Sequence, residues 1–140
     1  MAKVQLLAVL SLDGCLSEKN SESCWWLRPE SYGIADIRDR ATFELTMNTS
    51  LSMLMNWKTN EDDSVCYLIE ATTETAELVN GMLRMQLIDE IILYTVPFIA
   101  GTGRHLLTSP LPMSYWTFTG QQTYNGGVSR TVYLKKEDRE

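Results

Sequence analysis

The stretch LIDEIILYTVPFIAGTG, residues 87–103, contains a strongly apolar segment that is followed by proline and glycine. Residues 91–96 are almost continuously apolar, which is typical of a strand that is buried on both faces of a sheet. Pro97 ends this strand, because proline lacks the N–H group that a central strand donates to its neighbour. Gly101 and Gly103 then allow the chain to turn away from the sheet. The stretch therefore predicts a buried strand and the loop that leaves it.

The rest of the chain predicts a single α/β domain over residues 1–140. Short apolar runs predict further strands over residues 4–12, 43–47 and 65–69. We expect helices over residues 29–42, 49–57 and 73–86, the last with Thr72 or Thr73 as its N-cap.

The C-terminal part has a different pattern. Asn125-Gly126-Gly127 is a strong turn signal between two segments of alternating polarity, residues 113–123 and 128–135, which predicts a β-hairpin. The order of elements predicts a mixed, mainly parallel sheet that is flanked by helices and ends in this antiparallel hairpin.

The composition excludes several kinds of partner and site. The 140 residues carry a formal net charge of −6, which argues against binding to nucleic acid or to an anionic membrane surface. Three cysteines without a CxxC spacing, and the single histidine His105, predict neither a disulfide framework nor a metal site and favour a cytoplasmic location. The sequence contains no apolar run near the roughly 18 residues that a membrane-spanning helix needs.

Polar residues follow several of the predicted strands. Ligands of mixed α/β sheets bind outside the carboxyl ends of the parallel strands, and Asp13, Thr49, Glu70 and Pro97 fall at these ends. The Asp13 carboxylate has two interpretations that the residues alone leave open: it orients a substrate, or it caps the turn that ends the first strand.

Three stretches, taken in order, resemble the reductase domain of riboflavin biosynthesis, a relative of dihydrofolate reductase. They are Ser11-Leu12-Asp13-Gly14, Glu22-Ser23-Cys24-Trp25 and residues 87–103, and the resemblance covers most of the chain. It implies a dihydrofolate-reductase-like fold and hydride transfer from NADPH to a small-molecule substrate. In that family the substrate is 5-amino-6-(5-phosphoribosylamino)uracil, and catalysis rests mainly on orienting donor and acceptor. Reduction of another small carbonyl or pterin-like compound stays open.

The resemblance also implies roles for individual residues. Ser23 contacts the substrate and Trp25 the nicotinamide. Taken alone, the pair Trp25-Trp26 is more typical of a core, and it is the preceding stretch from Ser11 to Gly14 that favours the site. Arg40 binds the phosphoribosyl group of the substrate, since a guanidinium meets phosphate oxygens bidentately. Arg38 competes for this role, because the spacing from Trp25 to Arg40 is one residue longer than expected.

The stretch Glu70-Ala71-Thr72-Thr73 stands in the place of a Glu-Gly-Gly turn, whose backbone N–H groups hold the cofactor pyrophosphate in this family. Asp13 and Glu70 are the expected catalytic residues, and Glu70 also faces the substrate. The expected cofactor-binding residues are Trp25, Ser52, Thr72, Thr73, Gly101 and Gly103.

The sequence departs from the family in three ways. Both glycines of the Glu-Gly-Gly turn are replaced, and Cys15 and Cys24 stand where lysine is often found. A strand–helix pair that normally precedes the Glu-Gly-Gly strand is missing, because only residues 57–64 separate the flanking elements. These departures favour an alternative function, a non-catalytic homologue that serves as a binding or dimerisation module. A narrow sheet with an unprotected edge also predicts a homodimer.

Overall fold

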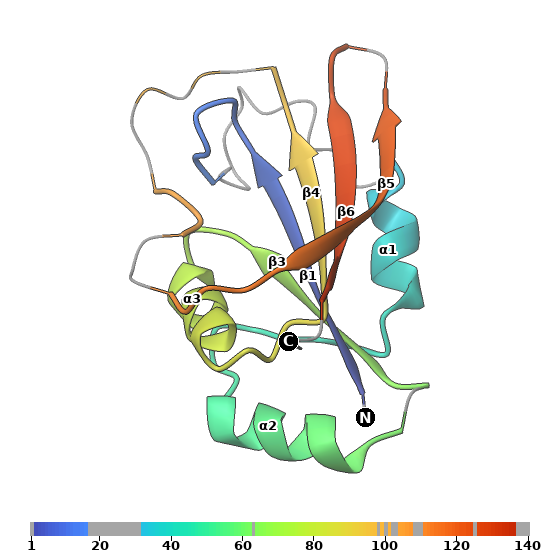
Figure 1. Cartoon of the computed structure of the whole chain (residues 1–140), viewed down its shortest axis with the longest axis vertical. Helices are drawn as coiled ribbons and strands as arrows, with labels where there is room; N and C mark the ends of the chain where they lie inside the picture. Colours follow the sequence, from blue (N-terminus) through green and yellow to red (C-terminus); the bar gives the residue numbers. More distant parts are fainter. Residues whose placement is uncertain are drawn as a thin grey trace.

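The computed structural model describes residues 2–16, 32–62, 64–97, 99, 101, 104–107, 111–124 and 126–136. These residues form one six-stranded sheet in the order β2-β3-β1-β4-β6-β5, together with three helices (Figure 1). In chain order the elements are β1 (Lys3–Leu10), α1 (Ile34–Arg40), β2 (Phe43–Glu44), α2 (Leu51–Asn60), β3 (Cys66–Ala71), α3 (Ala76–Arg84), β4 (Glu90–Thr95), β5 (Trp116–Thr123) and β6 (Ser129–Lys135).

The four strands β2, β3, β1 and β4 are parallel, and β6 and β5 add an antiparallel hairpin beside β4. The predicted fold class is therefore confirmed. The chain passes from β1 to the β2–β3 side of the sheet and then returns to place β4 on the other side of β1. This reversal makes β1 the switch point, next to which ligands of such sheets bind.

Helices cover both faces of the central strands. On β1, Leu6 and Ala8 pack in the core cluster that α2 and α3 cover, whereas Leu7 and Val9 pack in the cluster that contains Ile37 of α1. Figure 1 shows α1 on the other side of the sheet from α3. Because β1 is buried on both faces from Leu6 to Val9, this part of its sequence is continuously apolar rather than alternating.

The helix predicted from residue 73 begins three residues later, at Ala76, with Thr75 at the N-cap. The delay has a physical reason, because Thr72 and Thr75 exchange hydrogen bonds that hold the preceding residues in a turn. Helix α2 begins after Ser50, whose hydroxyl accepts a 3.4 Å hydrogen bond from Met53 N, and it extends three residues beyond the predicted end. The helix predicted over residues 29–42 is shorter in the structure, because α1 begins at Ile34 and ends at Arg40. Tyr32 and Gly33 have positive φ and form a turn instead of helix, and residues 29–31 lie outside the described ranges.

Strand β2 is only two residues long and pairs with β3 through Phe43 opposite Tyr67 and Glu44 opposite Leu68. Helix α2 then leads to β3 without another strand between them, as the short segment between these elements predicted. Among the described residues, β2 is thus one edge of the sheet and β5 is the other.

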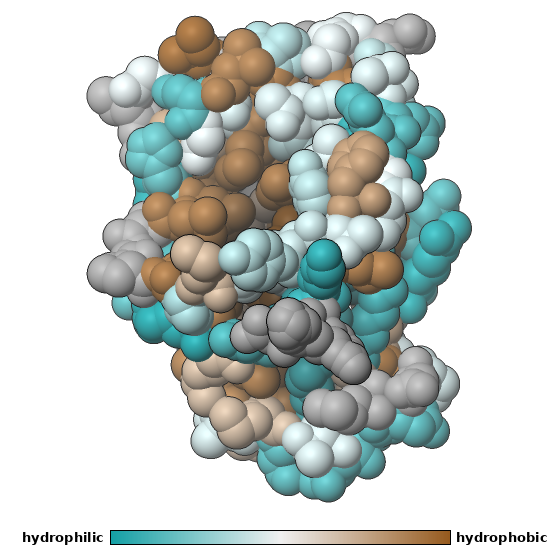
Figure 2. Space-filling model, viewed as in Figure 1, coloured by the Kyte–Doolittle hydropathy of each residue, from teal (hydrophilic) through white to brown (hydrophobic). Residues whose placement is uncertain are grey.

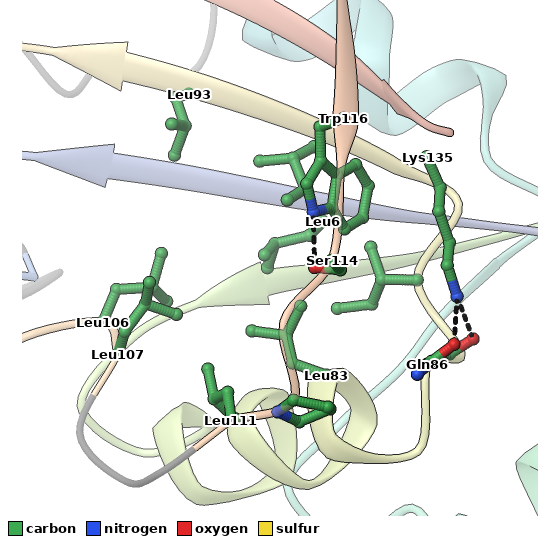
Figure 3. Close-up of a pocket in the computed structure, with 13 residues that line it drawn as sticks. Leu6, Leu83, Gln86, Leu93, Leu106, Leu107, Leu111, Ser114, Trp116 and Lys135 are labelled. Carbon is green, nitrogen blue, oxygen red and sulfur yellow. Dashed lines mark hydrogen bonds between the residues drawn. The ribbon is translucent and has the colours of Figure 1, made fainter. Parts of the chain in front are cut away.

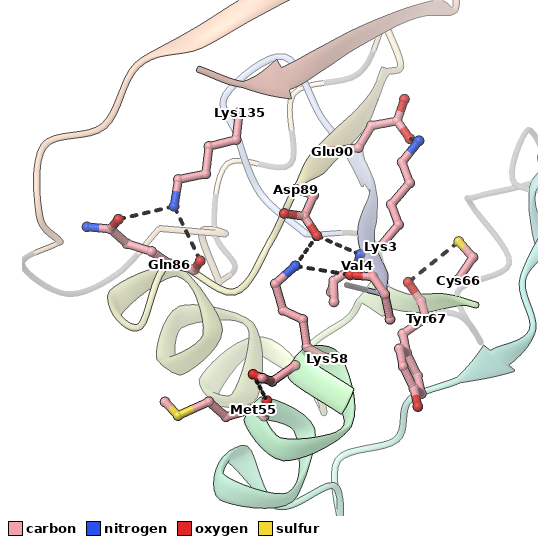
Figure 4. Close-up of polar contacts among 12 residues, drawn as sticks. Lys3, Val4, Met55, Lys58, Cys66, Tyr67, Gln86, Asp89, Glu90 and Lys135 are labelled. Atoms are coloured by element: carbon pink, nitrogen blue, oxygen red, sulfur yellow. Dashed lines mark hydrogen bonds and ion pairs between the residues drawn. The ribbon is translucent and has the colours of Figure 1, made fainter. Parts of the chain in front are cut away.

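At the amino ends of the central strands, Asp89 joins three elements (Figure 4). Its carboxylate accepts hydrogen bonds from Lys58 Nζ of α2 and, at 2.9 Å, from Val4 N of β1. Lys58 Nζ also donates to the Ala2 carbonyl at 3.2 Å, and the Lys58 side chain is 9% exposed. Asp89 is therefore a structural residue that closes the end of the sheet opposite to the predicted site.

None of the described helices is both long enough and apolar enough to cross a membrane.

Candidate functional site at the carboxyl ends of the strands

The loop that follows β1 forms a tight turn around Asp13. The Asp13 carboxylate accepts hydrogen bonds from Ser11 Oγ and, at 3.0 Å, from Gly101 N in the loop after β4. Ser11 Oγ in turn accepts from Cys15 N at 3.1 Å, and Gly14 has a φ of 81°, which favours glycine. Asp13 therefore caps the turn and ties the loops after β1 and β4 together.

His105 lies beside this turn. Cys15 and His105 form an isolated antiparallel bridge, and Leu16 N donates to the Arg104 carbonyl at 2.7 Å. A side chain at Gly14 would meet His105 Nδ1 at 3.5 Å. His105 is exposed, and it lies at the rim of the candidate site.

Arg38 and Glu70 meet between α1 and the end of β3. Arg38 Nη2 donates to Glu70 Oε1 at 2.7 Å, and the two side chains are 28% and 19% exposed. Arg40 lies two residues further along the helix and is exposed. Of the two competing arginines, Arg38 is thus the one that reaches the predicted substrate-facing glutamate.

The turn between β3 and α3 is closed by its own hydroxyl groups. Glu74 N and Thr75 N both donate to Thr72 Oγ1, at 3.2 and 3.3 Å, and Thr72 N donates to Thr75 Oγ1 at 2.9 Å. Thr75 Oγ1 donates to the Glu70 carbonyl at 2.7 Å. Threonine oxygens therefore occupy the backbone donors that a phosphate would use at a helix start.

The turn has most of the features that a cofactor pyrophosphate requires. The required N–H donors are present and point to oxygen atoms, and a charged phosphate makes stronger hydrogen bonds to them than a neutral hydroxyl does. The buried Thr72 side chain must rotate away before a phosphate can approach, and its Cβ keeps the backbone at a greater distance than glycine does. The turn therefore fits a phosphate, but the phosphate must compete with the Thr72 hydroxyl for the N–H groups of Glu74 and Thr75.

Arg104 is a residue that the sequence analysis did not single out. Its Nη1 donates to the Thr73 carbonyl at 3.4 Å, and its Nη2 lies 3.7 Å from Glu77 Oε2 in the first turn of α3. The guanidinium thus brings a positive charge to the start of α3, where an anion would bind. Its position directly after the glycine loop was the available signal.

The remaining predicted residues are not gathered around these groups. Ser52 is exposed in the first turn of α2, and its hydroxyl lies 3.0 Å from Ser50 Oγ. Ser23, Trp25 and Gly103 lie outside the described residues. Within the described part of the chain, no group of three or more His, Cys, Asp or Glu side chains is placed to bind a metal ion.

A separate apolar cavity of about 160 Å³ lies between α3 and the strands β4 to β6 (Figure 3). Leu6, Leu93 and Leu106 contribute to its lining, and Trp116 Nε1 donates to Ser114 Oγ at 2.9 Å at its side. Lys135 Nζ donates to the carbonyl and the side-chain oxygen of Gln86 at 3.3 and 3.1 Å. Apolar side chains also gather on the surface over this region (Figure 2). None of the predicted site residues that the structure describes lines this cavity.

Comparison with solved structures supports the fold. A deaminase/5-amino-6-(5-phosphoribosylamino)uracil reductase from Thermotoga maritima matches 96% of this chain and 56% of its own, with a TM-score of 0.67 and 11% identity. Dihydrofolate reductase from Enterococcus faecalis, solved as a complex with NADP(H), matches 96% of this chain and 97% of its own (TM-score 0.64, 7% identity). A Shewanella sp. PV-4 protein assigned to riboflavin biosynthesis matches 96% and 99% (TM-score 0.63, 14% identity).

No protein-family model and no curated protein sequence matches the chain. The chain spans little more than half of the bifunctional Thermotoga protein and nearly the whole of the other two. These likenesses show a dihydrofolate-reductase-like fold that resembles the reductase domain of riboflavin biosynthesis.

Proposed function

We propose that this chain is an NADPH-dependent reductase similar to the 5-amino-6-(5-phosphoribosylamino)uracil reductase of riboflavin biosynthesis. The observation that carries the proposal is the Arg38–Glu70 pair, with 2.7 Å between Arg38 Nη2 and Glu70 Oε1 at the carboxyl end of β3. β3 is adjacent to the switch-point strand β1, and ligands of this kind of sheet bind there. A guanidinium that is held by a carboxylate is already oriented, and this lowers the entropic cost of binding a substrate phosphate.

In this proposal the residues of the chain orient the substrate. Arg38 binds the substrate phosphate through its remaining N–H donors, and Glu70 fixes Arg38 and faces the substrate. Asp13 keeps the loops after β1 and β4 together through Ser11 and Gly101, so that the site keeps its shape. Catalysis then depends mainly on proximity and orientation.

The cofactor phosphates are held at the start of α3. The N–H groups of Glu74 and Thr75 donate to a phosphate in place of the Thr72 hydroxyl, and Arg104 supplies a positive charge beside them. When bound, NADPH supplies the hydride that is transferred to the substrate.

Titration calorimetry with NADPH, and with NADH for comparison, tests the proposal. We expect saturable NADPH binding, and we expect Arg104→Ala to weaken it about tenfold, as the loss of a hydrogen bond to a charged group does. Absence of NADPH binding up to millimolar cofactor would overturn the reductase function.

A non-catalytic binding or dimerisation module is the second candidate. The contacts of Thr72 favour it, because the hydroxyls of Thr72 and Thr75 already satisfy three backbone donors at the start of α3. If this candidate is correct, neither the wild type nor a variant that lacks the Thr72 side chain binds NADPH.

The chain is also proposed to be a homodimer that pairs through β5. This edge strand, WTFTGQQT, carries none of the charged residues or prolines with which proteins usually protect an exposed edge. The apolar side chains of Met113, Tyr115 and Phe118 are 81%, 59% and 53% exposed beside it. Sedimentation at micromolar concentration should give a dimer for the wild type and a monomer for Phe118→Lys. A monomeric wild type at that concentration contradicts this proposal.

A further inference from the structure

A groove at the opposite edge of the sheet lies between β2 and α2. Its volume is about 350 Å³, within the range of roughly 300–1,000 Å³ that is common for small-molecule sites. Residues from β2, α2 and β3 line it, and Thr49 lies at the side that leads into α2. None of the residues of the proposed reductase site contributes to this groove.

Three aromatic rings form one wall of the groove. The centroids of Phe43 and Tyr67 are 5.5 Å apart with 25° between the ring planes, and those of Trp57 and Tyr67 are 6.0 Å apart with 14° between the planes. Tyr67 is 4% exposed, whereas Phe43 is 54% exposed. The stack is therefore fixed in the core at Tyr67 and open to solvent at Phe43.

Two carboxylates, Glu44 and Glu61, also line the groove, and both residues are exposed. No Lys, Arg or His is among the described residues of the lining. The nearest cation along α2, Lys58, is buried and donates to Asp89 and to the Ala2 carbonyl. Burial and the charge of Glu61 both raise the pKa of Tyr67, so the negative charge acts on the groove wall.

Aromatic faces next to uncompensated carboxylates select a particular ligand chemistry. An organic cation is attracted by the ring faces and by the carboxylates together, whereas a neutral apolar ligand leaves the carboxylates unmatched. A quaternary ammonium group is weakly hydrated and is the typical ligand of such aromatic sites. A hard metal ion fits less well, because Ca²⁺ and Mg²⁺ require about six oxygen ligands and the groove offers two carboxylates.

We propose that the groove formed by Phe43, Trp57, Tyr67, Glu44 and Glu61 binds a small organic cation with a quaternary or alkylated ammonium group. The ammonium group contacts the exposed ring of Phe43, at the open end of the aromatic stack, and Glu61 supplies the opposite charge. The groove lies beside the edge strand β2, and Asp13, Arg38 and Glu70 do not line it, so it is separate from the proposed reductase site.

The probe for this proposal is choline, and the control ligand is 3,3-dimethyl-1-butanol, which has the same shape without the charge. Amide chemical-shift titration of the full chain measures both affinity and location. We expect saturable shifts in β2, α2 and β3 with choline and none of this kind with the neutral alcohol. Equal binding of the two ligands, or choline shifts confined to other elements, would overturn the proposal.

Substitutions at exposed positions change choline affinity without unfolding the chain. Phe43→Leu and Glu61→Gln should each weaken choline binding about threefold, and the double variant should weaken it further, consistent with a cation–π contact at a partly exposed site. Glu77→Gln changes an exposed carboxylate on α3 and should leave choline affinity unchanged. Unchanged affinity in Phe43→Leu and Glu61→Gln, with unfolding curves like that of the wild type, contradicts the proposal.

Discussion

The two ends of the parallel strands each carry a pair between a basic and an acidic side chain, and the two pairs have different partners. At the amino ends, the Lys58–Asp89 pair also bonds to Val4 N of β1 and to the carbonyl of Ala2, directly before this strand. At the carboxyl ends, the Arg38–Glu70 pair joins a helix side chain to a strand-end side chain. The first pair is thus built into the sheet, whereas the second lies where ligands bind in this fold.

This difference shows that a charged residue within a family motif can have a structural role instead of a role in ligand binding. Asp89 belongs to the stretch that most clearly predicts the fold, yet its carboxylate serves the backbone of β1 and the ammonium group of α2. Loss of either pair should therefore affect different properties, the stability of the sheet in one case and ligand affinity in the other.

The largest effect on stability is expected from Asp89→Ala. The substitution leaves Lys58, whose side chain is 9% exposed, as a buried cation without its carboxylate. Breaking a buried pair in this way costs about 3 kcal/mol, so the urea midpoint should fall strongly. Asp39→Ala, at an exposed position of α1, should change the free energy of unfolding by no more than about 0.5 kcal/mol. A loss below about 1 kcal/mol for Asp89→Ala would show that the two ends of the sheet do not differ in this way.

The next effect is on ligand affinity and concerns Arg38. Arg38→Ala should weaken binding of ribose 5-phosphate, a fragment of the proposed substrate, by about 10- to 100-fold, because a charge-assisted bidentate contact is lost. Calorimetric titration measures this loss, with ribose as the ligand that lacks the phosphate. Arg40→Ala is the matched control, since Arg40 is exposed two residues away on the same helix. Equal losses in the two variants would contradict the role of Arg38.

The strands of the sheet were predictable from the sequence because their local patterns match their burial. Strand β1 and residues 91–96 carry nearly continuous apolar runs, and this pattern alone indicated buried strands of a parallel sheet. The hairpin was predictable from the turn signal around Gly126 and Gly127, both of which have positive φ. The fold class was confirmed because local pattern and tertiary burial agree in these elements.

The contacts of the site were less predictable, because they depend on side chains that are distant in sequence. The choice between Arg38 and Arg40 depends on which helical face lies toward Glu70, 32 residues further along the chain. The start of α3 was predicted three residues too early, because threonine is a good N-cap residue at more than one position of the turn. The roles of Ser23 and Trp25 stay predictions, since both lie outside the described residues.

A smaller effect on cofactor affinity is expected at Thr72. Thr72→Gly removes both the competing hydroxyl and the Cβ, and NADPH affinity should rise about tenfold, whereas Thr72→Val keeps a branched side chain and should gain less. Both variants should lose about 1 kcal/mol of stability, because the hydroxyl that accepts from Glu74 N and Thr75 N is absent. Calorimetry and urea unfolding of the three proteins separate the two effects. Lower NADPH affinity in Thr72→Gly than in the wild type would contradict competition by the hydroxyl.

The smallest effect appears only at alkaline pH and concerns Tyr94 on β4. Burial raises the pKa of Tyr94 to about 12, and its hydroxyl donates to the Tyr32 carbonyl at 2.5 Å, next to the start of α1. Tyr32 itself has a φ of 65°, so this bond supports a strained turn at the carboxyl end of the sheet.

The sign of the pH dependence follows from where the proton is held. An unfolded tyrosine loses its proton near pH 10, whereas the folded chain keeps the Tyr94 proton until about pH 12. Between these values the unfolded state binds fewer protons, so the free energy of unfolding falls as the pH rises.

Tyr94→Phe lacks this proton and should lose less stability than the wild type between pH 10 and pH 11 in urea unfolding, although it is less stable at pH 8. The other tyrosines and the lysines are common to both proteins, so the difference between the two pH profiles isolates Tyr94. Parallel profiles would mean that Tyr94 ionises in the folded chain as it does in the unfolded one, and that water reaches this end of the sheet.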